Sequence, residues 1–195
     1  MHPTDPIYLA TDRLVLRPFT AADVDELYKL NNDPEVMRFL TGGKPVPRET
    51  IENETLPQFL ACYDKGDGYG FWAAVEKATG AFLGWFEFRP AKDGTPGVVE
   101  LGYRLNRAAW GKGYATEGAR ALIRKGFTEL GAERVRAETM AVNVRSRRVM
   151  EKAGLTHTRT FHLRWDDPLP GTEHGEVEYF LDRADWERRQ GVTNS

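Results

Sequence analysis

The sequence feature that most constrains the fold is a turn containing Gly111 and Gly113, which joins a strand pattern to a helix pattern. Residues 98–105 form a short run rich in β-branched and aromatic side chains, and after residue 114 apolar side chains recur at helical spacing. The two glycines allow positive φ angles and close approach of a ligand to the backbone. The first N–H groups of a helix lack partners within it and lie at the positive end of its dipole. The turn therefore predicts an anion site that suits a phosphate group.

Two common nucleotide-binding motifs are absent around this turn. The pattern G-x-x-x-x-G-K-[ST] does not occur, and the dinucleotide pattern G-x-G-x-x-G fails because residue 116 is Thr. A plain connecting turn is the alternative interpretation in a chain with 19 glycines. Charge favours a ligand, because residues 104–152 carry twelve basic and five acidic side chains in a chain of net charge −2. This balance indicates a small polyanionic ligand and excludes a protein that holds nucleic acid by bulk charge.

The order of the predicted elements describes one mixed α/β domain. A length of 195 residues with 41% hydrophobic residues suits a single core, and no linker signal interrupts the chain. The aromatic side chains between residues 71 and 88 are interpreted as core. The predicted strands are 11–19, 69–75, 82–89, 98–105, 135–143, 156–163 and 176–181, and helices are predicted from 20, from 34, over 56–63, over 114–130 and over 144–153.

Composition excludes several other classes of protein. Cys62 is the only cysteine, so no intrachain disulfide or cysteine-rich zinc site forms. The histidines at 2, 157, 162 and 174 lack metal-ligand spacing, and no metal is expected. No segment approaches the roughly 20 apolar residues that span a bilayer, and residues 1–12 lack the features of a signal peptide. We expect a soluble, cytoplasmic protein without a membrane or nucleic-acid partner.

Two motifs taken together resemble the GNAT superfamily of acetyl-CoA-dependent N-acetyltransferases. They are Trp110-Gly-Lys-Gly-Tyr-Ala-Thr-Glu117 and Asn143-Val-Arg-Ser-Arg-Arg-Val-Met-Glu-Lys-Ala-Gly154. Residues 11–18 and 32–35 are similar to the branch with the ribosomal-protein N-terminal acetyltransferases of RimJ/RimL type. The resemblance covers nearly the whole chain. It implies a single-domain GNAT fold over residues 1–195, an α/β (mixed α+β) fold in which helices flank a central, mostly antiparallel, twisted sheet splayed at the cofactor site.

The resemblance also implies acetyl-CoA as co-substrate and a set of residues that bind it. The main chain near Leu105 would pair with the pantetheine arm, and Asn143 would hydrogen-bond that arm from the other side. Backbone N–H groups of the turn would hold the pyrophosphate. The implied turn residues are Trp110, Gly111, Lys112, Gly113, Tyr114, Ala115 and Thr116, with Trp110 in place of the first polar residue of the family pattern.

Amine acetylation needs a proton acceptor for the amine and a proton donor for the leaving thiolate. Relatives place a carboxylate near Glu100, which is our predicted base, with Glu117 and Glu138 as weaker candidates. Glu117 also suits a purely structural role in the first turn of a helix. Many relatives place a tyrosine donor where this chain has Met150. Ser146 is the only serine before the last residue, and it is the predicted acid.

The predicted function is acetyl transfer from acetyl-CoA to a primary amine, either a protein N-terminus or a small molecule. Residues 20–55, part of the acceptor cleft in relatives, hold eight acidic and four basic side chains, which suits a cationic acceptor. Two alternatives stay open. One is a catalytically silent GNAT-fold module that binds acyl-CoA, and the other is a different phosphate-binding enzyme such as a nucleotide-dependent ligase. The sequence leaves the amine and the oligomeric state, including a homodimer, undecided.

Overall fold

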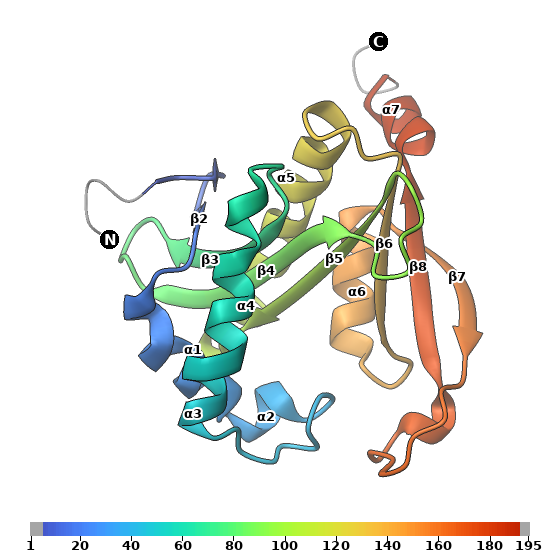
Figure 1. The fold of residues 1–195 in the computed structure, drawn as a ribbon. Coiled ribbons are helices and arrows are strands. Elements are labelled where there is room, and N and C mark those ends of the chain that lie inside the picture. Colours follow the sequence, from blue (N-terminus) through green and yellow to red (C-terminus); the bar gives the residue numbers. More distant parts are fainter. Residues whose placement is uncertain (1–5, 192–195) are drawn as a thin grey trace. The chain divides into compact units, whose positions relative to one another are not determined.

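The computed structural model describes residues 6–191, so His2 and the other residues of the ranges 1–5 and 192–195 lie outside the described part. Its sequence of elements is the predicted mixture of strands and helices (Figure 1). The strands are β1 Leu9–Ala10, β2 Leu14–Arg17, β3 Gly70–Glu76, β4 Phe82–Pro90, β5 Val98–Leu105, β6 Arg134–Met140, β7 Thr156–Phe161 and β8 Glu176–Asp182. The helices are α1 Val24–Asn31, α2 Pro34–Met37, α3 Arg48–Thr50, α4 Leu56–Ala61, α5 Tyr114–Thr128, α6 Val144–Ala153 and α7 Arg183–Gly191.

The strands hydrogen-bond in the order β1-β2-β3-β4-β5-β6-β8-β7, an open and mostly antiparallel sheet. The run β3-β4-β5 follows chain order. The pair β5–β6 is parallel, with Val98 opposite Arg134 and Glu100 opposite Arg136. A parallel pair needs a crossover connection, and here that connection is α5. This confirms the predicted fold class.

Two compact units divide the described residues, and each is considered by itself. The first unit contains residues 6–87 and 103–118. Its core is aromatic and aliphatic, and Phe59 stacks on Phe71 with ring centroids 4.0 Å apart. Trp85 meets both rings edge-on, so these aromatic side chains are core, as predicted. The buried members of this core include Phe19, Leu27, Leu30, Ile51, Phe59, Phe71 and Trp85.

Local capping chemistry positions the helices of the first unit. Thr20 and Asp23 form a capping box ahead of α1. Asp33 caps α2 through a 3.0 Å bond from the Glu35 N–H, and Pro34 takes the first helical position. Burial alone would raise the pKa of Asp23, but hydrogen bonds from Arg17 and Thr20 outweigh it and lower the pKa. The sequence signals for these helix starts were therefore correct.

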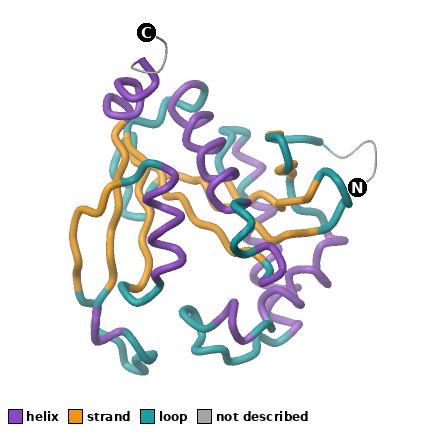
Figure 2. Tube along the Cα trace, turned by 180° about the vertical axis from the view of Figure 1, so that it is seen from behind, coloured by secondary structure: helices purple, strands orange, loops and turns teal. Residues whose placement is uncertain are grey.

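The second unit contains residues 88–102 and those from 119 onward. In it β6, β8 and β7 form an antiparallel ribbon, and α6 ends at Gly154, whose φ of 103° makes the left-handed cap. Side chains buried in this unit include Leu122, Ile123, Phe127, Val135 and Tyr179. Figure 2 shows the loop between β7 and β8, which carries one short helical turn.

The structure differs from the sequence prediction at several places, and α3 with the helical turn Ile51–Thr55 after it was not predicted. β7 ends at Phe161 instead of residue 163, and the two-residue β1 was not predicted. α7 was missed because it is polar around its whole circumference and lacks an apolar stripe. Intrahelical ion pairs such as Arg183–Glu187 (2.7 Å) and one aromatic contact from Trp186 to Phe127 accompany it instead.

Candidate functional site

The turn between β5 and α5 presents a row of backbone donors. Gly111 and Gly113 have φ angles of 73° and 86°, as the predicted turn requires. Within the described residues, none of the six N–H groups from Gly111 to Thr116 donates to a carbonyl or side chain. The first N–H with a partner is that of Glu117, which donates to the Gly113 carbonyl at 3.0 Å. The turn therefore has the unpartnered donors and the helix dipole of an anion site.

Arg13 fixes the shape of this turn from the start of β2. Its Nη1 donates to the Lys112 carbonyl at 2.9 Å, and its Nε donates to Glu117 at 2.7 Å. Thr11 donates to the same carboxylate at 2.6 Å. Sequence reasoning missed Arg13, because the contact spans about a hundred residues of chain and no local pattern marks it.

The Glu117 carboxylate accepts hydrogen bonds from Thr11 and Arg13 and so connects α5 to the segment before β2. Burial alone would raise its pKa, but the hydrogen bonds from Thr11 and Arg13 outweigh burial and lower the pKa of this carboxyl. A carboxylate with a lowered pKa accepts a proton poorly. The structural alternative stated for Glu117 therefore fits its surroundings better than a role as base.

The end of β5 is tied to the turn by Trp110. Its indole N–H donates to the Leu105 carbonyl at 2.8 Å. Gly84 of β4 lies so close to β5 that a Cβ there would be 2.1 Å from the Arg104 carbonyl oxygen. The predicted cofactor residues Leu105 and Trp110 thus contact each other, and one lone pair of the Leu105 carbonyl is already used.

In the second unit, Asn143 caps α6. Its Oδ1 accepts from the Ser146 N–H at 3.3 Å, and its Nδ2 donates to the Thr139 hydroxyl at 3.1 Å. One amide N–H of Asn143 remains in addition to these bonds. Ser146 lies half-buried in the first turn of α6, whereas Met150 is 2% exposed and belongs to the core. The structure therefore brings Asn143 and Ser146 together and keeps Met150 among apolar neighbours.

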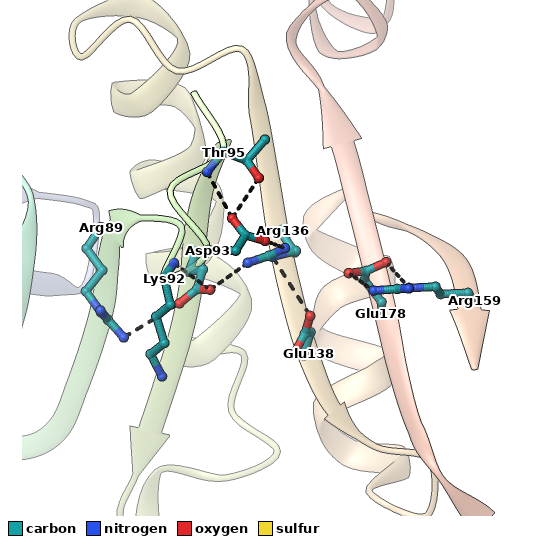
Figure 3. A network of polar contacts seen from close by, with 9 residues as sticks. Arg89, Lys92, Asp93, Thr95, Arg136, Glu138, Arg159 and Glu178 are labelled. Atoms are coloured by element: carbon teal, nitrogen blue, oxygen red, sulfur yellow. Dashed lines mark hydrogen bonds and ion pairs between the residues drawn. The ribbon is translucent and has the colours of Figure 1, made fainter. Parts of the chain in front are cut away.

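Glu100, also in the second unit, contacts a network of charges, and Figure 3 labels Arg89, Lys92 and Arg136 of this network. Its carboxylate accepts from Arg136 at 2.8 Å and from the Lys92 N–H at 3.2 Å, and Arg89 lies at 3.6 Å. Arg136 also donates to Asp93 at 2.7 Å. A hydrogen bond from Thr95 and then the Arg136 contact lower the pKa of Asp93. Glu100 is thus a largely covered carboxylate held by cations.

Glu138 lies on β6, two residues after Arg136, and faces a different environment from that of Glu100. It stands directly opposite Glu178 in the β6–β8 ladder, and Glu178 is 2% exposed and bound by Arg159 at 2.7 Å. Burial raises the pKa of Glu138, and neighbouring Glu178 adds to the rise against the pull of Arg136. Sequence alone could have predicted that Glu138 and Glu178 lie on the same face of the sheet only if the register of β6 and β8 had been known.

The chain belongs to the GNAT acetyltransferase family: that family's acetyltransferase (GNAT) domain matches residues 13–156. The matched residues include the turn, β5 and α6. The match rests on sequence and agrees with the fold described above.

Sequence similarity to individual proteins extends beyond residues 13–156. The chain is 39% identical to the FsC-acetyl coenzyme A-N(2)-transacetylase of Aspergillus fumigatus, over 93% of this chain and 79% of that protein. It is 37% identical to the uncharacterized protein YkkB of Bacillus subtilis, over 83% of this chain and 91% of that protein. Of these two relatives, the one from Aspergillus has acetyl coenzyme A in its name.

Solved structures share the fold. A GNAT-family acetyltransferase from Bacillus anthracis matches with a TM-score of 0.74 and 22% identity, over 90% of this chain and 98% of that chain. RimL, a ribosomal L7/L12 alpha-N-protein acetyltransferase in complex with coenzyme A, matches with a TM-score of 0.74 and 17% identity, over 91% and 98%. Among residues 6–191, no helix is both long enough and apolar enough to cross a membrane.

Proposed function

We propose that this protein transfers an acetyl group from acetyl-CoA to a primary amine by direct attack in a ternary complex. The observation that carries the proposal is the row of six unpartnered N–H groups from Gly111 to Thr116. Backbone donors at a helix N-terminus suit a pyrophosphate, and the exposed glycines leave the backbone open to it. When bound, acetyl-CoA supplies the activated acetyl thioester. Family membership supports the same donor.

The remaining cofactor contacts are proposed at Leu105, Trp110 and Asn143. The β5 backbone near Leu105 would pair with the pantetheine arm, and Trp110 would hold that strand end in place. Asn143 would bind the arm through its remaining amide N–H, while its oxygen caps α6. Turn residues Lys112, Tyr114 and Ala115 complete the set.

The acceptor is proposed to be a primary amine on a small molecule or a peptide N-terminus. The name of the Aspergillus relative specifies an N(2)-acetylation of FsC, which supports an amine on a small molecule. The fold shared with RimL supports an N-terminal amine equally. An acidic balance over residues 20–55 favours an acceptor with positive charge. A panel of small amines and N-terminal peptides, read by mass spectrometry of the product, decides between the two.

The amine must lose a proton to attack, because free alkyl amines are mostly protonated at pH 7. Glu100 is the proposed base, with Glu138 as the second candidate. Glu100 is hydrogen-bonded by Arg136, whereas burial raises the pKa of Glu138 and favours proton uptake there. The pH–rate profiles of Glu100→Gln and Glu138→Gln separate them. Loss of the base should reduce the rate most at low pH and be partly rescued at high pH, and an unaltered profile removes that residue.

Ser146 is proposed to protonate the departing thiolate. It lies in the first turn of α6 beside Asn143, and the position of the usual tyrosine is filled by the buried Met150. We expect Ser146→Ala to lower kcat by about 100-fold, with little change in acetyl-CoA affinity. An unchanged kcat would assign thiolate protonation to water and leave Ser146 a structural residue.

The catalytically silent module is the second candidate function, and Met150 is the observation that favours it. A silent module would bind acetyl-CoA, and this binding would raise the melting temperature of the protein. No amine would then cause the release of free thiol. Steady thiol release with an acetylated product excludes it.

A further inference from the structure

Arg104 of β5 has no carboxylate in ion-pair contact within the described residues of its own unit, and Glu87 is the anion whose charge acts on it. Its Nη1 donates to Oδ1 of Asn31 at 2.5 Å, and its guanidinium lies 4.9 Å from the centre of the Trp85 ring. Its Nε is fully buried and has no hydrogen-bond partner. Across residues 6–191, no carboxylate forms an ion pair with it.

Other arginines of the same unit are paired. Arg17 binds Asp23 at 2.6 Å, and Arg107, three residues after Arg104, binds Asp33 at 2.8 Å. Burial lowers the pKa of Arg104 to about 10 against the charge of Glu87, so its side chain stays protonated at neutral pH. A mostly covered charge without a carboxylate in direct contact is costly, and an aromatic face, one amide and the more remote charge of Glu87 offset only part of the cost.

Two donors in this cluster remain available to a ligand. Nη2 of Arg104 and Nδ2 of Asn31 have no hydrogen-bond partner within the described part of the chain. Unlike Nε, neither atom is fully buried. Asn31 is itself 4% exposed at the end of α1, which holds its amide in place. A guanidinium edge beside an amide N–H matches the two oxygens of a carboxylate.

The chain position of Arg104 links it to the proposed reaction. It precedes Leu105, the proposed contact of the pantetheine arm, on the same strand. Gly84 lies very close to the Arg104 carbonyl and to Leu105, so the strand backbone at Arg104 has little room to move. A ligand group bound by Arg104 would therefore be held at a defined distance along β5 from the cofactor arm.

We propose that Arg104 and Asn31 bind a carboxylate of the acceptor, so that the acceptor is a small amine carrying its own acid group. This inference rests on the proposed acetyl transfer. An acceptor of this class carries both charges, with the ammonium suited to the acidic stretch and the carboxylate to Arg104. The site selects among amines and leaves the chemical step to other residues.

The test compares each amino acid of a panel with its α-amide, which keeps the amine and removes the carboxylate. For wild type and Arg104→Gln, the ratio of kcat/KM for acid over amide is measured, so differences in amine reactivity cancel. We expect Arg104→Gln to lower this ratio about tenfold or more, mainly through KM for the acid. Arg107→Gln, an exposed and already paired neighbour, serves as the matched control and should leave the ratio unchanged.

A ratio that is equal in wild type and Arg104→Gln would overturn the proposal, and so would equal use of acids and amides by wild type. Arg104→Lys keeps the charge and removes the forked geometry, so we expect it to lower the acid-over-amide ratio in part. This variant replaces Arg104→Gln in the test if the glutamine variant does not fold. Calorimetric titration of the amino acids onto protein saturated with coenzyme A tests the site without turnover. Binding that is absent or independent of Arg104 contradicts it, whereas lack of product with every amine contradicts only the proposed acetyl transfer.

Discussion

At the scale of single residues, three glutamates of the same chemistry occupy three different electrostatic environments. Glu117 is held by Arg13 and Thr11, and its pKa is lowered. Glu100 is bound by Arg136, and Glu138 faces another carboxylate. Sequence could nominate all three as bases, because it shows residue type and approximate position. It ranked Glu100 first by its place in the strand, but it could not give their electrostatic environments, because their partners come from distant segments whose register only the fold defines.

The raised pKa of Glu138 makes a prediction about stability. Its folded pKa lies above its ordinary value, so its contribution to stability is present at acidic pH and is lost as pH rises through the folded pKa. Glu138→Gln removes that loss, and we expect a higher melting temperature than wild type at pH 7. The difference should shrink near pH 4, where wild type is protonated as well.

Glu54→Gln is the control for this measurement, because Glu54 is exposed and far less constrained. Its melting curves should follow wild type at both pH values. A Glu138→Gln variant that is less stable than wild type at pH 7 would show that the Arg136 contact dominates Glu138 instead.

At the scale of elements, glycines decide how closely helices and strands approach. Gly126 of α5 packs on Phe88, and a Cβ there would lie 2.5 Å from the ring. Gly113 serves the turn in another way, since its φ of 86° disfavours any side chain. The sequence located the glycine turn through its motif. It gave no signal that the glycines within α5 face aromatic rings, because packing partners are not local.

We expect Gly126→Ala to destabilise the protein by about 1–3 kcal/mol through overpacking. Helix propensity alone predicts the opposite sign, a gain of about 1 kcal/mol. Gly191→Ala, at a helical glycine with open space around its Cβ, is the control and should be neutral or slightly stabilising. Chemical denaturation measures both, and an unchanged or raised stability of Gly126→Ala would contradict the packing described for α5.

Gly113→Val tests the turn itself. We expect it to weaken coenzyme A binding, because the side chain strains the backbone and blocks its approach to the pyrophosphate. Gly94→Val is matched to it, with a φ of 73° and open space, in a loop outside the proposed site. Both variants should lose stability, but only Gly113→Val should lose affinity in calorimetry. Equal affinity of the two variants for coenzyme A would move the pyrophosphate away from this turn.

At the scale of the whole molecule, the residues that cap helices and form turns allowed much of the fold to be predicted from the sequence. β5 and α6 were predicted to the residue, because Asn143 and Gly154 mark the ends of α6 and turn residues flank β5. α7 escaped prediction because its helix has no apolar stripe. The proposed site around Arg104 was not predicted either, because the covering of Arg104 without a carboxylate in contact exists only in the folded chain. Function was predictable to the extent that motifs determine chemistry, while specificity depends on long-range contacts.

The most direct test of the account is acetyl transfer itself. Purified full-length protein is incubated with acetyl-CoA carrying an isotope label in its acetyl group, together with the panel of amines and N-terminal peptides. Free thiol and labelled product are measured in the same reaction. The account predicts thiol release that depends on the amine, matched by an equal amount of N-acetylated product. Binding of acetyl-CoA without product from any amine would contradict it and identify the protein as a silent module.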